Sequence, residues 1–240
     1  GIEPPAADAA SLGQWFDDEF PTWNFADLVP LTHDRYDTAC NWKLAMDTFG
    51  ETYHFSSLHK DTLINSFHGN VQCYDEEAHL HRMILCRRDI DQMRLLPEDE
   101  WEIEVAALTV YWIFPNVILM PFKFGCFLVR AYPGADPGHH VSRVDFYLKG
   151  ELANAEGPEA AAVADFIGSV AQNFAGIIRD EDYVMSASQQ TAANSGALRQ
   201  VVFGRNEPAL HHYHDTYANR LGLERPPLLD ATDVAAAMAR

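Results

Sequence analysis

An apolar stripe at helical spacing runs through residues 41–59. Four side chains recur at steps of four, three and four residues, as on the buried face of a helix: Trp42, Met46, Phe49 and Tyr53. A second face of the same helix would carry Asp47, Glu51 and His54. Asp47 and Glu51 are like charges one turn apart, which is unfavourable on an ordinary surface helix. Such a local conflict, close to two histidines, indicates a functional site.

The spacing of His54 and His59 predicts an interruption of this helix. A step of five residues turns the second side chain about 140° away on a regular helix, so both rings could not reach one ion. Ser56 and Ser57 are poor interior helix residues, and we expect the helix to break there. Two inward imidazoles beside the carboxylate of Glu51 suggest a metal ion. If one further carboxylate completes the set, the metal is predicted to be ferrous iron with open positions for oxygen.

The rest of the pattern predicts an antiparallel sheet between helices. Apolar runs and alternations predict extended segments at 28–40, 71–74, 79–86, 105–114, 117–122, 124–132 and 141–149. A long helix is expected from about Pro158 to about Gln190, and another at 207–221 with Asn206 as its N-cap. Strands in the middle of the chain with helices on either side indicate an α+β fold.

The long helix contains an acidic group that could supply the missing carboxylate. Its apolar stripe consists of Val163, Phe166, Ile167, Val170, Phe174 and Ile177. Continued without a break, this stripe centres on Glu181 and leaves Asp182 near its edge. Periodicity alone therefore does not choose between the two, and the triplet Asp180–Asp182 could also be a solvated acidic turn.

Composition limits the function classes. A net charge of −18 and a pI near 4.8 argue against nucleic acid as a partner and disfavour an anionic membrane surface. We expect no membrane span, because no apolar run looks long enough, and no signal peptide is visible. Four scattered cysteines predict reduced thiols in a cytoplasmic protein. The length of 240 residues fits one large domain.

The stretch at 41–59 resembles the mononuclear-iron motif of Rieske-type non-haem oxygenases, the α subunits of aromatic ring-hydroxylating enzymes. The matching residues, in order, are Asn41, Trp42, Lys43, Asp47, Glu51, Tyr53, His54 and His59. A second match is Glu181-Asp182 followed by Gln190. A third is Gly204, Asn206 and Glu207 before a His- and Tyr-rich helix. The similarity covers most of residues 25–222.

This resemblance implies a ligand set and a fold. It implies that His54, His59 and Asp182 bind Fe(II), and that Glu51 links the iron to an electron-donating Rieske [2Fe-2S] cluster on the neighbouring subunit of a homotrimer. Asp47 is the other acid of the motif and is taken as a second catalytic candidate. The implied fold is helix-grip (Bet v 1-like), with helices covering one face of an antiparallel sheet. The implied reaction is hydroxylation in aromatic compound catabolism.

The Rieske cluster is not expected from this chain. The family's cluster ligands are Cys-x-His and Cys-x-x-His pairs, and none of the four cysteines begins one: Cys40, Cys73, Cys86 and Cys126. We expect an N-terminal arm at 1–24, a catalytic domain at 25–222 and a peripheral tail at 223–240. The chain begins with glycine, as a processed chain or a fragment would. The catalytic domain of a longer protein, electron supply by another polypeptide such as a ferredoxin or reductase, and loss of the redox function all remain open.

Two other functions compete with oxygen activation on an apolar or aromatic small molecule. One is a non-catalytic helix-grip module that binds a ligand, and the other is a zinc hydrolase, which no zincin motif supports.

Five apolar residues are candidates for the wall of a substrate cavity: Phe49, Phe55, Ile113, Phe122 and Phe174. Other histidines are not expected to be ligands: the strand pair His79 and His81, the loop pair His139 and His140, and the helix group His211, His212 and His214.

Overall fold

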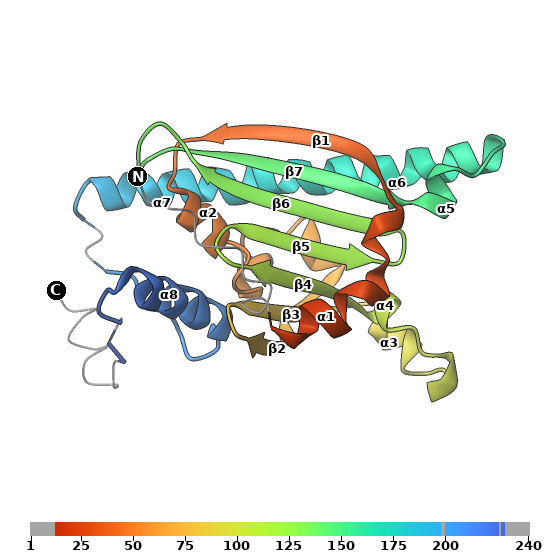
Figure 1. Ribbon diagram of the computed structural model, residues 1–240, viewed down its shortest axis with the longest axis horizontal. Helices are drawn as coiled ribbons and strands as arrows, with labels where there is room; N and C mark the ends of the chain where they lie inside the picture. The colour runs from red at the N-terminus through yellow and green to blue at the C-terminus, as the bar shows by residue number, and fades with distance from the viewer. Residues whose placement is uncertain (1–12, 198–199, 226, 229–240) are drawn as a thin grey trace.

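A seven-stranded antiparallel sheet forms the centre of the molecule (Figure 1). The computed structural model describes residues 13–197, 200–225 and 227–228. The strands lie in the order β1-β7-β6-β5-β4-β3-β2, so the first strand pairs with the last. They are β1 Leu28–Thr38, β2 Phe67–Glu77, β3 Leu80–Arg87, β4 Ala107–Ile113, β5 Val117–Phe122, β6 Gly125–Pro133 and β7 His140–Lys149. The predicted strands and the α+β fold are confirmed.

Strand β7 shows how the sheet separates its two faces. Val144, Phe146 and Leu148 are buried in the core, as their alternation predicts. Asp145 is also buried, against its place on the expected polar face. Its carboxylate accepts a hydrogen bond from Arg130 and lies 2.8 Å from Nδ1 of His33. These partners compensate for the loss of water around a buried charge.

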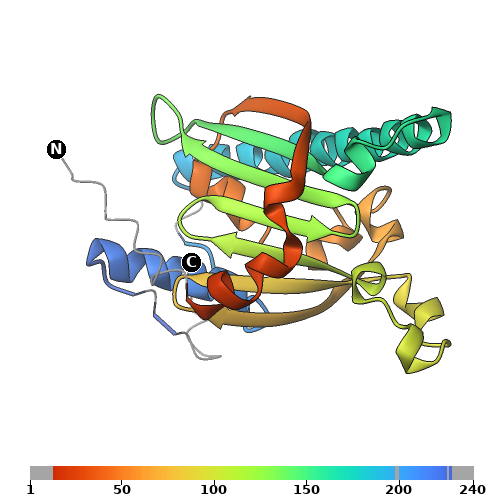
Figure 2. The same ribbon diagram turned by 45° about the vertical axis from the view of Figure 1, so that its right-hand side comes forward.

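Helical segments lie on both faces of the sheet. The long α6 (Pro158–Ile177) and α7 (Tyr183–Asn194) cover one face, and a chain of short helices crosses the other (Figure 2). These short helices are α1 Gln14–Asp18, η2 Phe20–Trp23 and η3 Phe25–Asp27. Phe20 is buried and packs edge-on against Tyr111 of β4, with ring centroids 5.0 Å apart. The described part of the N-terminal arm therefore packs on the sheet at Phe20.

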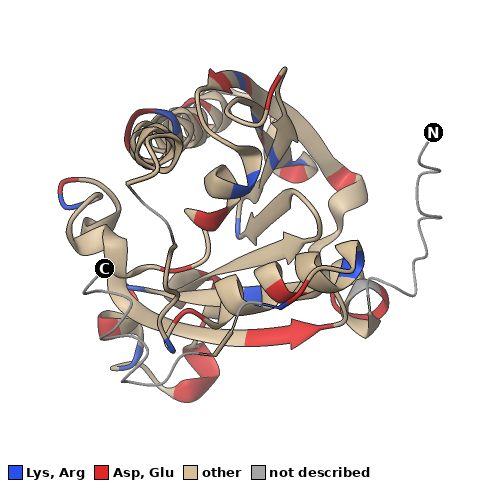
Figure 3. Cartoon of the chain, turned by 90° about the vertical axis from the view of Figure 1, so that its left-hand side faces the viewer, with Lys and Arg blue, Asp and Glu red and all other residues tan. Residues whose placement is uncertain are grey.

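The long helix differs from its prediction in length and regularity. A π-helical turn, η7 (Ile178–Asp182), joins α6 to α7, and the combined rod runs from Pro158 to Asn194. Its most apolar window has a mean hydropathy of 1.4, so by length and composition it could span a membrane, contrary to the sequence expectation. However, Ile167, Ala171 and Ala175 pack in the core under the sheet. Figure 3 shows the sheet curving around this rod, with acidic residues spread over several elements.

The motif helix ends earlier than predicted. Helix α2 covers only Trp42–Asp47, and the short 3-10 helix η4 (Tyr53–Ser56) follows after a turn. The α-helix therefore ends before His54, earlier than expected, and the 3-10 turn that carries His54 ends at Ser56 with Ser57 as its C-cap, as the prediction of a break between the two histidines requires. Gly50 lies three residues beyond the end of α2, and a Cβ atom there would lie 2.3 Å from Cδ2 of Leu210. Only glycine permits this approach of the two segments, and glycine is a weak helix former.

Helix α8 (Pro208–Leu221) packs beside β2 and β3 and begins one residue later than expected. Its N-cap is Glu207, so the prediction of Asn206 as the cap is wrong. Pro208 at the first helical position explains the start, because its fixed φ suits that position and it has no N–H to satisfy. The remaining short helices are η5 Leu63–Asn65, α3 Ile90–Met93, η6 Glu98–Glu100, α4 Ile103–Ala106 and α5 Gly150–Ala153. Of the predicted tail, residues 226 and 229–240 lie outside the described part.

Candidate metal centre

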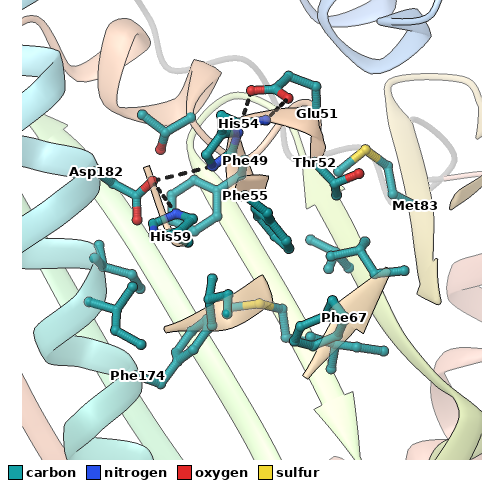
Figure 4. A pocket seen from close by; sticks show the side chains of 18 residues that line it. Phe49, Glu51, Thr52, His54, Phe55, His59, Phe67, Met83, Phe174 and Asp182 are labelled. Atoms are coloured by element: carbon teal, nitrogen blue, oxygen red, sulfur yellow. Dashed lines mark hydrogen bonds and ion pairs between the residues drawn. The ribbon is translucent and has the colours of Figure 1, made fainter. Parts of the chain in front are cut away.

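Three side chains from two distant segments converge on one point inside the molecule (Figure 4). Nε2 of His59 lies 3.2 Å from Oδ1 of Asp182, and Nε2 of His54 lies 3.7 Å from the same oxygen. His59 and Asp182 are buried and His54 is partly buried. One ligand atom from each of the three falls within 4.8 Å of the others. This is the grouping of two imidazoles and one carboxylate that suits Fe(II).

The π-turn decides which acid takes part. A π-turn adds a residue to one turn of the helix, which shifts every later side chain around the axis. Asp182, at the end of η7, is thereby buried and faces both rings. Glu181 also faces His59, but from the other edge of the ring. The regular period used in the sequence argument cannot show this shift.

Each imidazole is held by a carboxylate at its outer nitrogen. Nδ1 of His54 forms a short hydrogen bond with Glu51, whose other oxygen accepts the His54 backbone N–H at 3.1 Å. Nδ1 of His59 lies 2.7 Å from Oε2 of Glu181, which also accepts a hydrogen bond from Thr62. A ring that donates Nδ1–H leaves the lone pair of Nε2 for a metal. Sequence analysis missed this role of Glu181, and its position next to Asp182 was the available signal.

The electrostatics of the cluster favour a cation. Burial disfavours a charged His59, but the carboxylates of Asp182 and Glu181 outweigh it and raise the pKa of His59. With Glu51, three carboxylates surround two imidazoles. A divalent ion fits this donor set. It would take the place of a proton on the imidazole nitrogens that face Asp182, and its positive charge would offset part of the negative charge of the three carboxylates.

Asp47 does not reach the cluster. Its Oδ1 lies 3.0 Å from Nε2 of His214, so it connects the end of α2 to α8. Burial raises the pKa of Asp47, and the hydrogen bond from His214 opposes that rise. The catalytic role of Asp47 stays a prediction, whereas its contact with α8 is structural.

The other histidines have separate partners. His81 is fully buried on an inner strand, and its Nδ1 lies 3.0 Å from Nδ1 of His212. His79 precedes β3 and His81 lies on it, and β3 is an inner strand, because the edge strands of the sheet are β1 and β2. His139 is exposed as expected, but His140 is buried at the start of β7 and bonds the carbonyl of Cys40. The described histidines other than His54 and His59 belong to no group of three metal-binding side chains.

An apolar cavity, here called the inner chamber, adjoins the three ligands. Phe49, Phe55 and Phe174 line this chamber, as predicted. A larger space beside it, here called the outer groove, is lined by Phe122 among others, and Ile113 lines neither space. The free volume is about 50 Å³ in the chamber and about 720 Å³ in the groove. Five residues line both spaces and are here called the neck: Leu63, Phe67, Leu108, Phe174 and Ile177.

The family model described as "Ring hydroxylating alpha subunit (catalytic domain)" matches residues 25–223. The chain belongs to this family. Its members are oxidoreductases of the oxygenase type, and the family implies a mononuclear iron site, for which His54, His59 and Asp182 are a suitable group. The fold is accordingly the helix-grip α+β fold of Rieske oxygenase catalytic domains.

Solved structures agree at the level of the fold. The quaternary ammonium Rieske monooxygenase CntA, in complex with L-carnitine, is 14% identical over 92% of this chain and 56% of its own, with a TM-score of 0.63. The NdmA QL mutant of Pseudomonas putida CBB5 with theobromine is 14% identical over 87% and 58% of the two chains, with a TM-score of 0.52. The present chain therefore spans about half the length of these proteins. A comparison with curated proteins gives no match.

Proposed function

We propose that this chain activates O₂ at a mononuclear non-haem Fe(II) and hydroxylates an apolar or aromatic small molecule. The observation that carries the proposal is the convergence of two Nε2 atoms on Oδ1 of Asp182, while both Nδ1 atoms are bound to other carboxylates. His54, His59 and Asp182 would hold the iron, which supplies a site for binding and reducing O₂. Three protein ligands leave further positions open for that purpose.

The chain's own residues prepare the site for this chemistry. Glu51 and Glu181 fix the ring orientations and the tautomers of His54 and His59. The apolar walls of the inner chamber exclude water around the reacting groups and accept an apolar substrate. The apolar chamber suits a hydroxylating site, whereas no zincin motif supports a zinc hydrolase.

Glu51 is proposed as the link to the electron donor. It lines the inner chamber on one side and a surface hollow with Tyr53, Tyr74 and Arg205 on the other. Hydroxylation of one C–H bond by O₂ consumes two electrons and two protons and releases one water. We propose that the electrons come from a Rieske [2Fe-2S] cluster of another domain or chain, across this hollow. The homotrimer, the cytoplasmic location and the role in aromatic compound catabolism are proposed from the family alone.

Nitric oxide tests the proposal without knowledge of the substrate. It binds Fe(II) where O₂ would bind and gives a half-integer-spin signal in electron paramagnetic resonance. We expect this signal from the anaerobic Fe(II)-loaded chain and its loss in His59→Ala, but not in the exposed-site control His139→Ala. A non-catalytic ligand-binding module, which no described feature favours, would give no such signal.

A further inference from the structure

The inner chamber is too small for a whole substrate molecule. Its free volume of about 50 Å³ is far below the roughly 300–1,000 Å³ of an ordinary ligand pocket, and O₂ must share it with the substrate. The space that is left suits a methyl or methylene group better than a six-membered ring.

The chamber also selects the chemistry of what enters. Apart from the three ligands and Glu51, Thr48 and Thr52 are its only polar lining residues in the described part of the chain. A polar substrate group placed there would lose its water without finding enough partners. The entering end must therefore be apolar as well as small.

The outer groove has the opposite properties. Its volume of about 720 Å³ is that of an ordinary ligand pocket. It offers polar side chains, among them Arg87, Gln172 and Asn173, beside aromatic ones such as Phe122 and Phe127. Phe67 and Phe174, of the neck, lie at the end of the chamber away from the metal ligands (Figure 4).

We propose that the substrate inserts a methyl- or methylene-sized apolar end through the neck, while its larger, more polar body stays in the outer groove. This inference rests on the proposed function. The oxidised C–H bond then belongs to an alkyl end and not to an aromatic ring. One oxygen atom of O₂ enters that bond and the other leaves as water, with two protons from solvent and two electrons from the external [2Fe-2S] donor. Phe174 lines both spaces and would set the width of this passage.

Paramagnetic relaxation shows which end of a bound molecule faces the metal. The probes are 4-methylbenzamide and 4-tert-butylbenzamide, added to the full chain loaded with Mn(II). We expect the methyl protons of the first probe to relax at least tenfold faster than the protons beside its amide, and the second probe to bind at least tenfold more weakly. Equal relaxation of all protons, no relaxation of the methyl group, or equal binding of the two probes would overturn the inference.

Substitutions separate this inference from the proposed function. Phe174→Ala, or Phe174→Leu if the first variant does not fold, should reduce the preference for the methyl probe to less than threefold. Phe166→Ala is the matched control, because Phe166 is 69% exposed on the same helix and lines neither space. An unchanged preference in the Phe174 variants overturns the role of the neck. Mn(II) effects that persist in His54→Ala would instead overturn the metal site, and with it the proposed function.

Discussion

Glu181 holds His59 from the side opposite the metal position, with Oε2 at 2.7 Å from Nδ1 of the ring. The adjacent Asp182 faces Nε2 of the same ring at 3.2 Å. Two consecutive residues therefore clamp one imidazole at both nitrogens, which the π-turn of η7 makes possible. The π-turn therefore positions both Asp182 and Glu181 around the ring of His59.

Glu181→Gln should weaken metal binding although Glu181 is not proposed as a ligand. A neutral amide polarises the ring less and does not select its tautomer, so we expect a 10–100-fold loss of Fe(II) affinity. Anaerobic calorimetric titration measures it. Asp180→Asn is the control, because Asp180 is exposed and pairs with Arg179. An affinity of Glu181→Gln equal to that of the parent would show that this contact does not support the site.

Gly50→Ala should destabilise the fold where the motif segment meets α8. The added Cβ would lie 2.3 Å from Cδ2 and 2.7 Å from Cγ of Leu210, and such overpacking costs about 1–3 kcal/mol. Urea denaturation measures this free energy. Gly176→Ala, inside α6 with no atom within 4 Å of its new Cβ, should instead stabilise the protein by about 0.5–1 kcal/mol. Equal effects of the two substitutions would contradict the close contact at Gly50.

His81 should make the stability depend on pH. Burial, with a smaller effect of His212, lowers the pKa of His81 well below its usual value. Below about pH 6.5 the unfolded chain therefore binds a proton at His81 that the folded chain does not. The free energy of unfolding is highest above that pH and decreases as the pH falls. From pH 7 to 5.5 the loss is about 1 kcal/mol. Urea denaturation at both pH values should show that His81→Phe removes this part of the dependence.

The matched substitution for that experiment is His139→Phe, on an exposed loop. The loss of pH dependence should be larger in His81→Phe than in His139→Phe, because burial lowers the pKa of His81. A parent whose stability does not change between the two pH values would show that His81 accepts a proton without cost. An equal change in the parent and in His81→Phe would assign the effect to other groups, such as His140, whose pKa burial also lowers.

Local patterns predicted most of the fold. Alternation predicted the strand at 141–149, where Val144, Phe146 and Leu148 are buried, and the separate segments at 105–114 and 117–122 correspond to β4 and β5. Local patterns could not show the close contact of Gly50 with Leu210 just beyond the end of α2, because the two residues lie 160 positions apart in the chain. The same limit applies to Asn206, where the proline at 208 delays the helix.

The structure brings together His54, His59 and Asp182, the three predicted metal ligands, but the local geometry that does so was not predicted. The spacing of His54 and His59 indicated a metal and an irregular segment, and the family resemblance selected Asp182. Periodicity alone did not choose between Glu181 and Asp182, because it assumed a regular helix where the chain makes a π-turn. Asp47 shares a predicted helix face with Glu51, but that face ends with α2, and Asp47 contacts His214 instead.

The most direct test of the account is the Fe(II) stoichiometry and affinity of the purified full chain, titrated without oxygen. We predict one tightly bound ion for the parent and at least a tenfold loss of affinity for each of His54→Ala, His59→Ala and Asp182→Ala, with folding checked by circular dichroism. His211→Ala, on α8, should bind like the parent. If the three variants keep the parent's affinity while folded, the metal centre described here is wrong.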